Sequence, residues 1–156
     1  MFEVKTTDML SHEYFMKEAL KEAKKAFEKD EVPVGAVLVF NEKIIARAHN
    51  LTETLNDVTA HAEMQIITAA ANTLGGKYLH DCTLYVTVEP CCMCAAACFW
   101  AQVDSVIYGT DDSKRGTISL GYSLFHPKTK IEKGILADEA ALLMKQFFKN
   151  KRNHDD

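Results

Sequence analysis

Two short segments of the chain carry side chains that could together bind a metal ion. The first contains His61 and Glu63, and the second contains Cys91 and Cys94 directly after Pro90. Cysteines at positions i and i+3 of a helix point from the same face, so both thiols can reach one ion. The positive end of a helix lowers the pKa of a thiol and favours the thiolate, the form that binds zinc. With the neutral imidazole of His61, these cysteines predict a three-ligand zinc site.

A site with three protein ligands indicates catalysis, because the fourth tetrahedral position is left to water. Zinc makes such a water a source of hydroxide near neutral pH. Glu63 lies close to the predicted ligand His61 in the chain and is the candidate proton carrier. The sequence therefore predicts one Zn²⁺ per subunit, held by His61, Cys91 and Cys94, with Glu63 as the catalytic residue.

Other interpretations of these residues stay open at this point. A lone C-x-x-C motif can be a redox pair or two buried thiols. Cys92 lies about 100° around the helix from Cys91 and is expected to face the core or a neighbour. If Cys82, Cys92 or Cys98 completed a shell of four ligands, the site would be structural and closed to water. Because Glu63 would then have no task, we favour the catalytic site.

Hydrophobic patterns predict the helices and strands that position these side chains. Ser11 can cap a first helix with one apolar stripe, and the last helix is expected to bury Ala140, Leu143, Phe147 and Phe148. The helices are expected over 11–29, from about 59 to 75, over 90–101 and over 136–150. The strands are expected over 34–40, 43–49, 83–88 and 103–108, with a short further strand at 130–132.

This order of elements predicts an α/β fold. A hairpin followed by strands with crossover helices forms a mixed sheet of about five strands, covered by helices in a three-layer α/β/α domain. Both predicted ligand segments begin helices, and the second directly follows the carboxyl end of a strand. Ligands bind at that edge of open α/β sheets. The sheet would therefore bring the two segments together at a binding edge.

Length and composition favour one soluble globular domain. The chain has 156 residues, of which 47% are hydrophobic and 26% are charged. This fits a single domain over residues 1–156 with a sizeable core. No apolar run approaches the roughly 20 residues that cross a bilayer, and the N-terminus lacks the layout of a secretory signal. Five cysteines, most of them clustered, do not resemble a disulfide framework, so a cytoplasmic location is expected.

Charge alone argues mildly against a nucleic-acid partner, because the net charge is −4. The basic residues are unevenly distributed, however. They gather between Ser113 and Lys133, a range that overlaps the long loop 109–128, and near the C-terminus. Lys114 and Arg115 lie in the first group, and Lys145, Lys149 and Arg152 in the second. Long loops of compact domains are often functional, although a solvated surface is the simpler explanation of such charges.

The pattern H-x-E followed by P-C-x-x-C is the signature of zinc deaminases. The likeness extends beyond this signature, from about residue 11 to residue 152. The chain resembles the bacterial tRNA-specific adenosine deaminases. The segments that carry the resemblance are 11–14, 31–39, 57–63, 84–91 and 134–139.

This resemblance implies the hydrolytic conversion of adenosine to inosine at the wobble base of a tRNA anticodon stem-loop. It implies that the zinc-bound hydroxide attacks C6 of a flipped-out adenine while Glu63 transfers protons. Asn50 and Ala62 match positions that bind the base, and Asp112, Lys114 and Gly116 match a segment near the RNA backbone. The resemblance also implies a homodimer whose RNA site spans the interface.

Several positions depart from the pattern of this family. Val58 replaces a common proline, and Leu51 follows Asn50 where a basic residue is frequent. Asp111 stands where arginine is often found. Two alternatives therefore stay open. One is a deaminase of a free base or nucleoside, such as guanine, cytosine or adenosine. The other is a catalytically silent, zinc-stabilised RNA-binding module.

Overall fold

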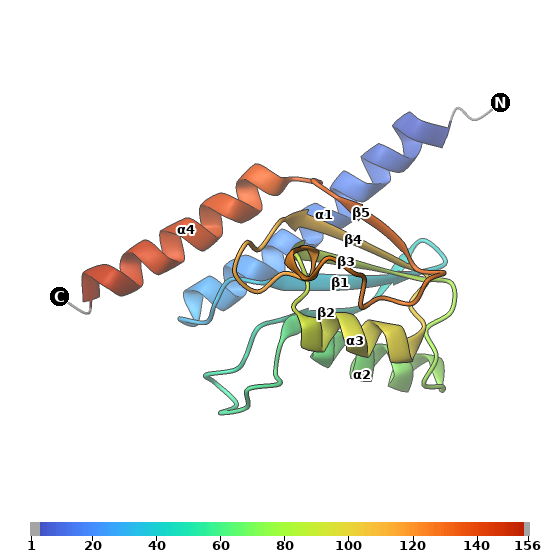
Figure 1. Cartoon of the computed structure of the whole chain (residues 1–156), viewed down its shortest axis with the longest axis horizontal. Coiled ribbons are helices and arrows are strands. Elements are labelled where there is room, and N and C mark those ends of the chain that lie inside the picture. The colour runs from blue at the N-terminus through green and yellow to red at the C-terminus, as the bar shows by residue number, and fades with distance from the viewer. Residues whose placement is uncertain (1–3, 155–156) are drawn as a thin grey trace.

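The computed structural model describes residues 4–154 and contains a single five-stranded sheet flanked by helices (Figure 1). Across the sheet the strands follow the order β2-β1-β3-β4-β5. In chain order the elements are α1 (Val4–Glu28), β1 (Gly35–Phe40), β2 (Lys43–His49), α2 (Ala62–Leu74), β3 (Cys82–Val88), α3 (Cys92–Ala101), β4 (Ser105–Thr110), the 3₁₀ turn η1 (Ile118–Leu120), β5 (Lys130–Lys133) and α4 (Ala137–His154).

The sheet is mixed, as the order of the elements predicts. β1 is antiparallel to both β2 and β3, whereas β3, β4 and β5 run parallel. Helices α2 and α3 cover one face, and α1 and α4 cover the other (Figure 1). The three-layer α/β/α prediction with five strands is therefore confirmed.

Alternation along β1 explains why this strand lies at the centre of two cores. Ala36 and Leu38 point toward α2 and α3, whereas Val37 and Val39 point toward α1. Each set is buried because successive side chains of a strand face opposite sides of the sheet. At the start of the strand, a Cβ on Gly35 would overlap backbone atoms of α1. Glycine at this position therefore lets α1 pack directly on the sheet.

Two predicted helix starts shift because the metal-site residues occupy N-cap positions. His61 has φ −70° and ψ 155°, and Cys91 has φ −71° and ψ 174°, so both are extended and precede the helices. Helices α2 and α3 consequently begin later than the sequence predicts. The prediction that Ser11 caps the first helix is wrong, because α1 already runs from Val4.

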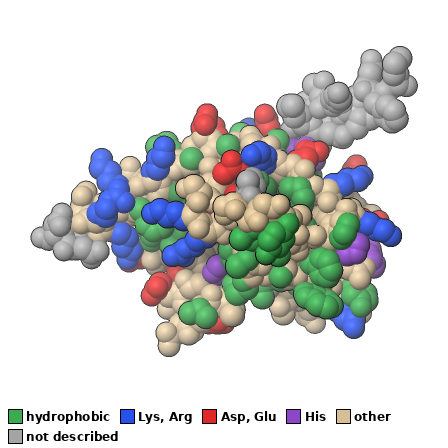
Figure 2. Space-filling model, in the orientation of Figure 1, with side chains coloured by type: hydrophobic (Ala, Val, Ile, Leu, Met, Phe, Trp, Pro, Cys, Tyr) green, Lys and Arg blue, Asp and Glu red, His purple; other side chains and the backbone are tan. Residues whose placement is uncertain are grey.

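The last helix is only partly buried. Ala140 and Phe147 lie in the interior, and Leu143 is half-buried, but the predicted burial of Phe148 is wrong because 42% of this side chain is exposed. The outer surface of α4 carries a group of lysine and arginine side chains (Figure 2). Over residues 4–154, no helix combines the length and the apolar character that crossing a membrane requires.

Candidate metal centre and its cavity

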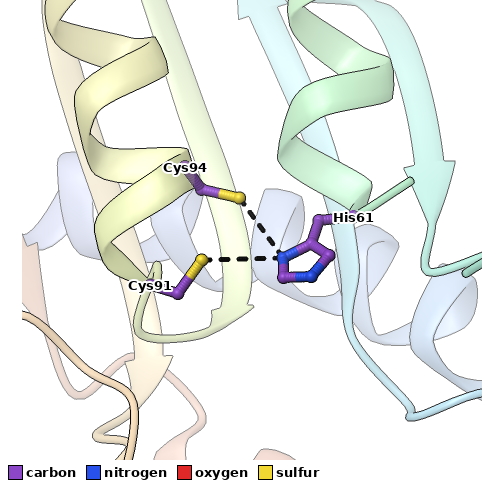
Figure 3. A group of neighbouring side chains, drawn as sticks. All are labelled: His61, Cys91 and Cys94. Atoms are coloured by element: carbon purple, nitrogen blue, oxygen red, sulfur yellow. Dashed lines mark hydrogen bonds between the residues drawn. The ribbon is translucent and has the colours of Figure 1, made fainter. Parts of the chain in front are cut away.

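Three predicted ligand atoms meet between the N-termini of α2 and α3 (Figure 3). The Nδ1 atom of His61 lies 3.6 Å from the Sγ of Cys91 and 3.4 Å from the Sγ of Cys94. Cys94 is fully buried, and His61 and Cys91 are half-buried. The fold therefore brings together the two segments that the sequence motif joins.

The spacing of these atoms fits zinc. Tetrahedral zinc forms bonds of about 2.0–2.1 Å to nitrogen and about 2.3 Å to sulfur, which places a nitrogen and a sulfur ligand atom about 3.6 Å apart. Within residues 4–154, the one group of His, Cys, Asp or Glu side chains whose ligand atoms lie within 4.8 Å of one another consists of His61, Cys91 and Cys94. A closed shell completed by Cys82, Cys92 or Cys98 is therefore not supported by the geometry.

The remaining cysteines lie in other environments. Cys92 is exposed, so the expectation that it faces the core or a neighbour is wrong. Cys82 and Cys98 are buried. Burial and the nearby Asp104 and Asp81 raise the pKa of Cys82 to about 11. Burial also raises the pKa of Cys98 well above its usual range. Both side chains are therefore protonated thiols that pack as small hydrophobic groups.

The ligand thiols are electrostatically coupled. The hydrogen bond with Cys94, aided by the one with His61, lowers the pKa of Cys91 to about 4 against the effect of burial. The same contact between the two cysteines, with burial, raises the pKa of Cys94. The contact with Cys91 raises the pKa of His61. A bound cation would favour the deprotonated form of each of the three groups.

Glu63 lies in the first turn of α2, with only 3% of its surface exposed. Burial raises the pKa of its carboxyl group, and a hydrogen bond with Cys94 opposes that shift. The carboxyl group also lines the cavity above the metal centre. A carboxyl group in this environment can hold and release a proton beside the bound ion.

A cavity of about 690 Å³ is lined by two of the three predicted ligands, His61 and Cys91, and by Glu63. Of the residues that the resemblance assigns to the substrate, Gly116 lies outside the lining, and four belong to it: Asn50, Ala62, Asp112 and Lys114. Asn50 is buried, and its backbone N–H donates to Val34 at 3.0 Å. Asp112 accepts two backbone hydrogen bonds through Oδ1, from Lys114 and Arg115, each at 3.0 Å. Its carboxylate therefore already shapes the loop, and direct contact with RNA stays a prediction.

The loop between β2 and α2, which forms the wall beside Asn50, is held by a buried carboxylate. Oxygens of Glu31 accept the backbone N–H groups of Glu53 at 2.9 Å and of Thr54 at 2.7 Å. Burial favours the neutral acid, but these hydrogen bonds lower the pKa of Glu31. At the base of the loop, Leu51 N–H donates to the Ala60 carbonyl at 3.0 Å. The wall is thus ordered at both ends.

One face of α4 forms a cavity wall that the sequence interpretation did not assign. Ala141, Lys145, Phe148 and Arg152 line the cavity from this helix. They occur at i, i+4, i+7 and i+11, the spacing of a single helical face. This spacing was visible in the sequence, but it does not show whether the face covers the core or the cavity.

Comparison with known proteins agrees with this geometry. The model of the cytidine and deoxycytidylate deaminase zinc-binding region matches residues 9–110. A relative from Bacillus subtilis, called tRNA-specific adenosine deaminase, is 46% identical over 149 residues, covering 92% of this chain and 92% of that protein. One from Agrobacterium fabrum, of the same name, is 44% identical over 152 residues, covering 94% and 100%.

Solved structures give the same result. One from work on A-to-I editing by tRNA:A34 deaminases has a TM-score of 0.78 and 43% identity, covering 83% of this chain and 98% of that one. A guanine deaminase from Bacillus subtilis has a TM-score of 0.63 and 38% identity, covering 72% and 71%. The fold and the His-Cys-Cys centre are those of a zinc-binding deaminase domain. With these identities across nearly its full length, the chain belongs to the tRNA-specific adenosine deaminase family.

Proposed function

We propose that this chain deaminates adenosine to inosine at the wobble position of a tRNA anticodon, with zinc bound by His61, Cys91 and Cys94. The observation that carries the proposal is the three-atom centre with Glu63 beside it, at the floor of a cavity rimmed by lysine and arginine. The names of the full-length relatives support the same reaction.

The reaction adds water to C6 of adenine, breaks the bond from C6 to the exocyclic nitrogen and releases ammonia. A zinc ion at this centre lowers the pKa of water and so supplies the nucleophile. Glu63 takes the proton released by that water and delivers protons to the ring and to the leaving ammonia. Asn50, buried at the cavity wall, orients the base through its side-chain amide.

The rim of the cavity favours an RNA over a free base. Lys114 and Arg115 approach from the loop after β4, and Lys145 and Arg152 approach from α4. These lysine and arginine side chains can bind phosphates, and the partly exposed ring of Phe148 can stack on a nucleobase. Asp111 stands where the family often has arginine, but its negative charge is balanced, because its carboxylate lies 3.3 Å from the Lys133 ammonium. The cavity lining thus contains these four basic side chains together with four carboxyl groups, those of Glu63, Glu89, Asp111 and Asp112.

Deamination of a free base is the second candidate function, because the guanine deaminase of Bacillus subtilis is 38% identical to this chain. The two functions separate in one assay. The purified zinc protein should form inosine in an anticodon stem-loop with adenosine at the wobble position. A stem-loop with guanosine there should release no ammonia. Efficient ammonia release from guanine, cytosine or adenosine, without inosine in the stem-loop, would contradict the RNA function.

We further propose a homodimer formed through the exposed side of α3. Hydrophobic side chains gather over this helix in Figure 2. Trp100 at its end is 76% exposed, and in the following loop Leu120 is 42% and Tyr122 is 66% exposed. Exposed apolar side chains that gather over one helix mark an interaction surface.

Replacing Trp100 with aspartate should convert the protein from dimer to monomer, because the carboxylate would be buried unpaired in the interface. Sedimentation would show wild type at twice the 17.5 kDa chain mass and the variant near that mass. The exposed Leu142 of α4 provides the control, because Leu142→Asp should leave the dimer intact. A monomeric wild type would contradict the proposed interface.

Three further features belong to this proposal. Residues 1–156 form one domain, since a single sheet orders the described chain. Each subunit binds one zinc ion, in keeping with the single three-atom centre found within residues 4–154. The protein acts in the cytoplasm, where reduced thiols persist, and its five cysteines are free.

A further inference from the structure

A second buried carboxylate beside the metal centre has no task in the proposed chemistry. Glu89 follows the last residue of β3 and precedes the ligand helix, and only 5% of its surface is exposed. Its backbone N–H donates to the Thr110 carbonyl at 2.8 Å. Burying a carboxylate is costly unless hydrogen bonds compensate it, so its partners indicate its role.

Those partners belong to the loop after β4, which forms the basic wall of the cavity. The Asp112 N–H donates to Glu89 Oε1 at 3.0 Å, and the Thr117 hydroxyl donates to Oε2 at 3.4 Å. Gly116 closes the loop over the carboxylate. A Cβ at this position would overlap Glu89 Oε1 and lie 2.5 Å from the Asp112 carbonyl oxygen. The loop and the carboxylate therefore fit together only with glycine at position 116.

The same hydrogen bonds continue to the basic side chains. Asp112 Oδ1 accepts the N–H groups of Lys114 and Arg115, each at 3.0 Å, and the Asp112 carbonyl accepts the Gly116 N–H at 2.9 Å. Gly116 also forms an isolated antiparallel bridge with Cys91. Residues 112–116 are thus one hydrogen-bonded unit, attached to Glu89 on one side and to the metal-site strand end on the other.

We propose that Glu89 is a positioning residue for the RNA substrate. Its carboxylate holds residues 112–116 over the metal centre and so directs Lys114 and Arg115 at the phosphates beside the reacting nucleotide. This inference rests on the proposed RNA function. The physical reason is preorganisation, because a loop that is already ordered loses less conformational entropy when the RNA binds.

The experiment compares Glu89→Ala with a matched control. Glu18→Ala also removes a buried carboxylate that accepts two hydrogen bonds, from Arg47 at 3.0 Å and from Lys21 at 3.2 Å, but Glu18 lies on α1, outside the cavity lining. A general loss of stability would affect both variants alike. Glu89→Gln keeps an acceptor for Asp112 and serves as the conservative rescue. Gly116→Ala disturbs the same contact from the other side.

For inosine formation in the stem-loop, Glu89→Ala should raise KM tenfold, which corresponds to a loss of about 1.4 kcal/mol in binding free energy. We expect kcat and bound zinc to stay within about twofold of wild type, because the ligands and Glu63 are untouched. Gly116→Ala should behave similarly, Glu89→Gln should restore most of the loss, and Glu18→Ala should leave KM unchanged.

Two results test the route through the basic pair. The first variant replaces Lys114 and Arg115 together by alanine. The slope of log KM against log salt concentration should then fall by about 1.4, because each lost contact with a single-strand phosphate lowers it by about 0.7. Glu89→Ala alone should lower this slope by the same amount. Introduced into the double variant, Glu89→Ala should raise KM by less than about twofold. The inference would be overturned if the KM effects of Glu89→Ala and of the double variant multiplied when combined. A loss of zinc or of kcat at unchanged KM would overturn it as well. An inactive wild type would instead refute the proposed function.

Discussion

Replacing Glu63 with glutamine should lower kcat for inosine formation about a thousandfold, within the range that general acid–base catalysis provides. Glutamine has nearly the same size and can still accept a hydrogen bond, but it cannot take up and release the reaction's protons. The group of atoms within 4.8 Å that could hold the metal comprises His61, Cys91 and Cys94, so zinc binding should persist. The expected protein is folded, zinc-loaded and inactive, with RNA affinity close to that of wild type.

The matched control is Glu18→Gln. Glu18 is also buried, but it lies on α1, on the far side of the sheet, where its carboxylate accepts a hydrogen bond from Arg47 at 3.0 Å. This variant should lose some stability and keep kcat. Single-turnover rates and zinc content would be measured for both proteins. Retained activity in Glu63→Gln would contradict the role of Glu63 as proton carrier. An unchanged phenotype in cells that carry the variant would favour the silent RNA-binding module over the enzyme.

The metal centre was predictable because its information is local. The spacing of Cys91 and Cys94 places both thiols on one helical face, and the strand before them indicates the binding edge. The hydrophobic patterns likewise predicted the mixed sheet, since the apolar runs Gly35–Phe40 and Cys82–Val88 are properties of single segments. What the patterns missed were the two ligand helix starts, which depend on backbone angles at the N-caps.

The cavity walls depend on how distant elements pack, and single segments do not contain that information. Phe148 reads as core from its position on an apolar stripe, yet α4 extends past the sheet, and this ring reaches the cavity. The role of Glu89 was hidden for the same reason, because its partner Asp112 lies 23 positions later in the chain. Only the folded structure brings such pairs together.

Replacing Cys94 with serine should remove zinc and activity together, because serine is a poor zinc ligand and the two remaining ligands cannot hold the ion tightly. The side chain of Cys94 is fully buried, and serine differs from it by one atom, so the fold should survive. Zinc that binds only the folded chain contributes about 4 kcal/mol at a thousandfold excess over its Kd, so Tm should fall by on the order of 10 °C.

Cys98 supplies the control for this prediction, because it is equally buried on the same helix, one turn beyond Cys94. Cys98→Ser should keep one zinc per chain, its activity, and a Tm that still falls when a chelator is added. Cys94→Ser should show no further fall with the chelator, because it has no ion to lose. If Cys98→Ser lost zinc as well, a fourth thiolate would complete the shell, and the centre would be structural rather than open to water. Metal content and Tm, each with and without chelator, therefore separate an open catalytic centre from a closed one without relying on the activity assay.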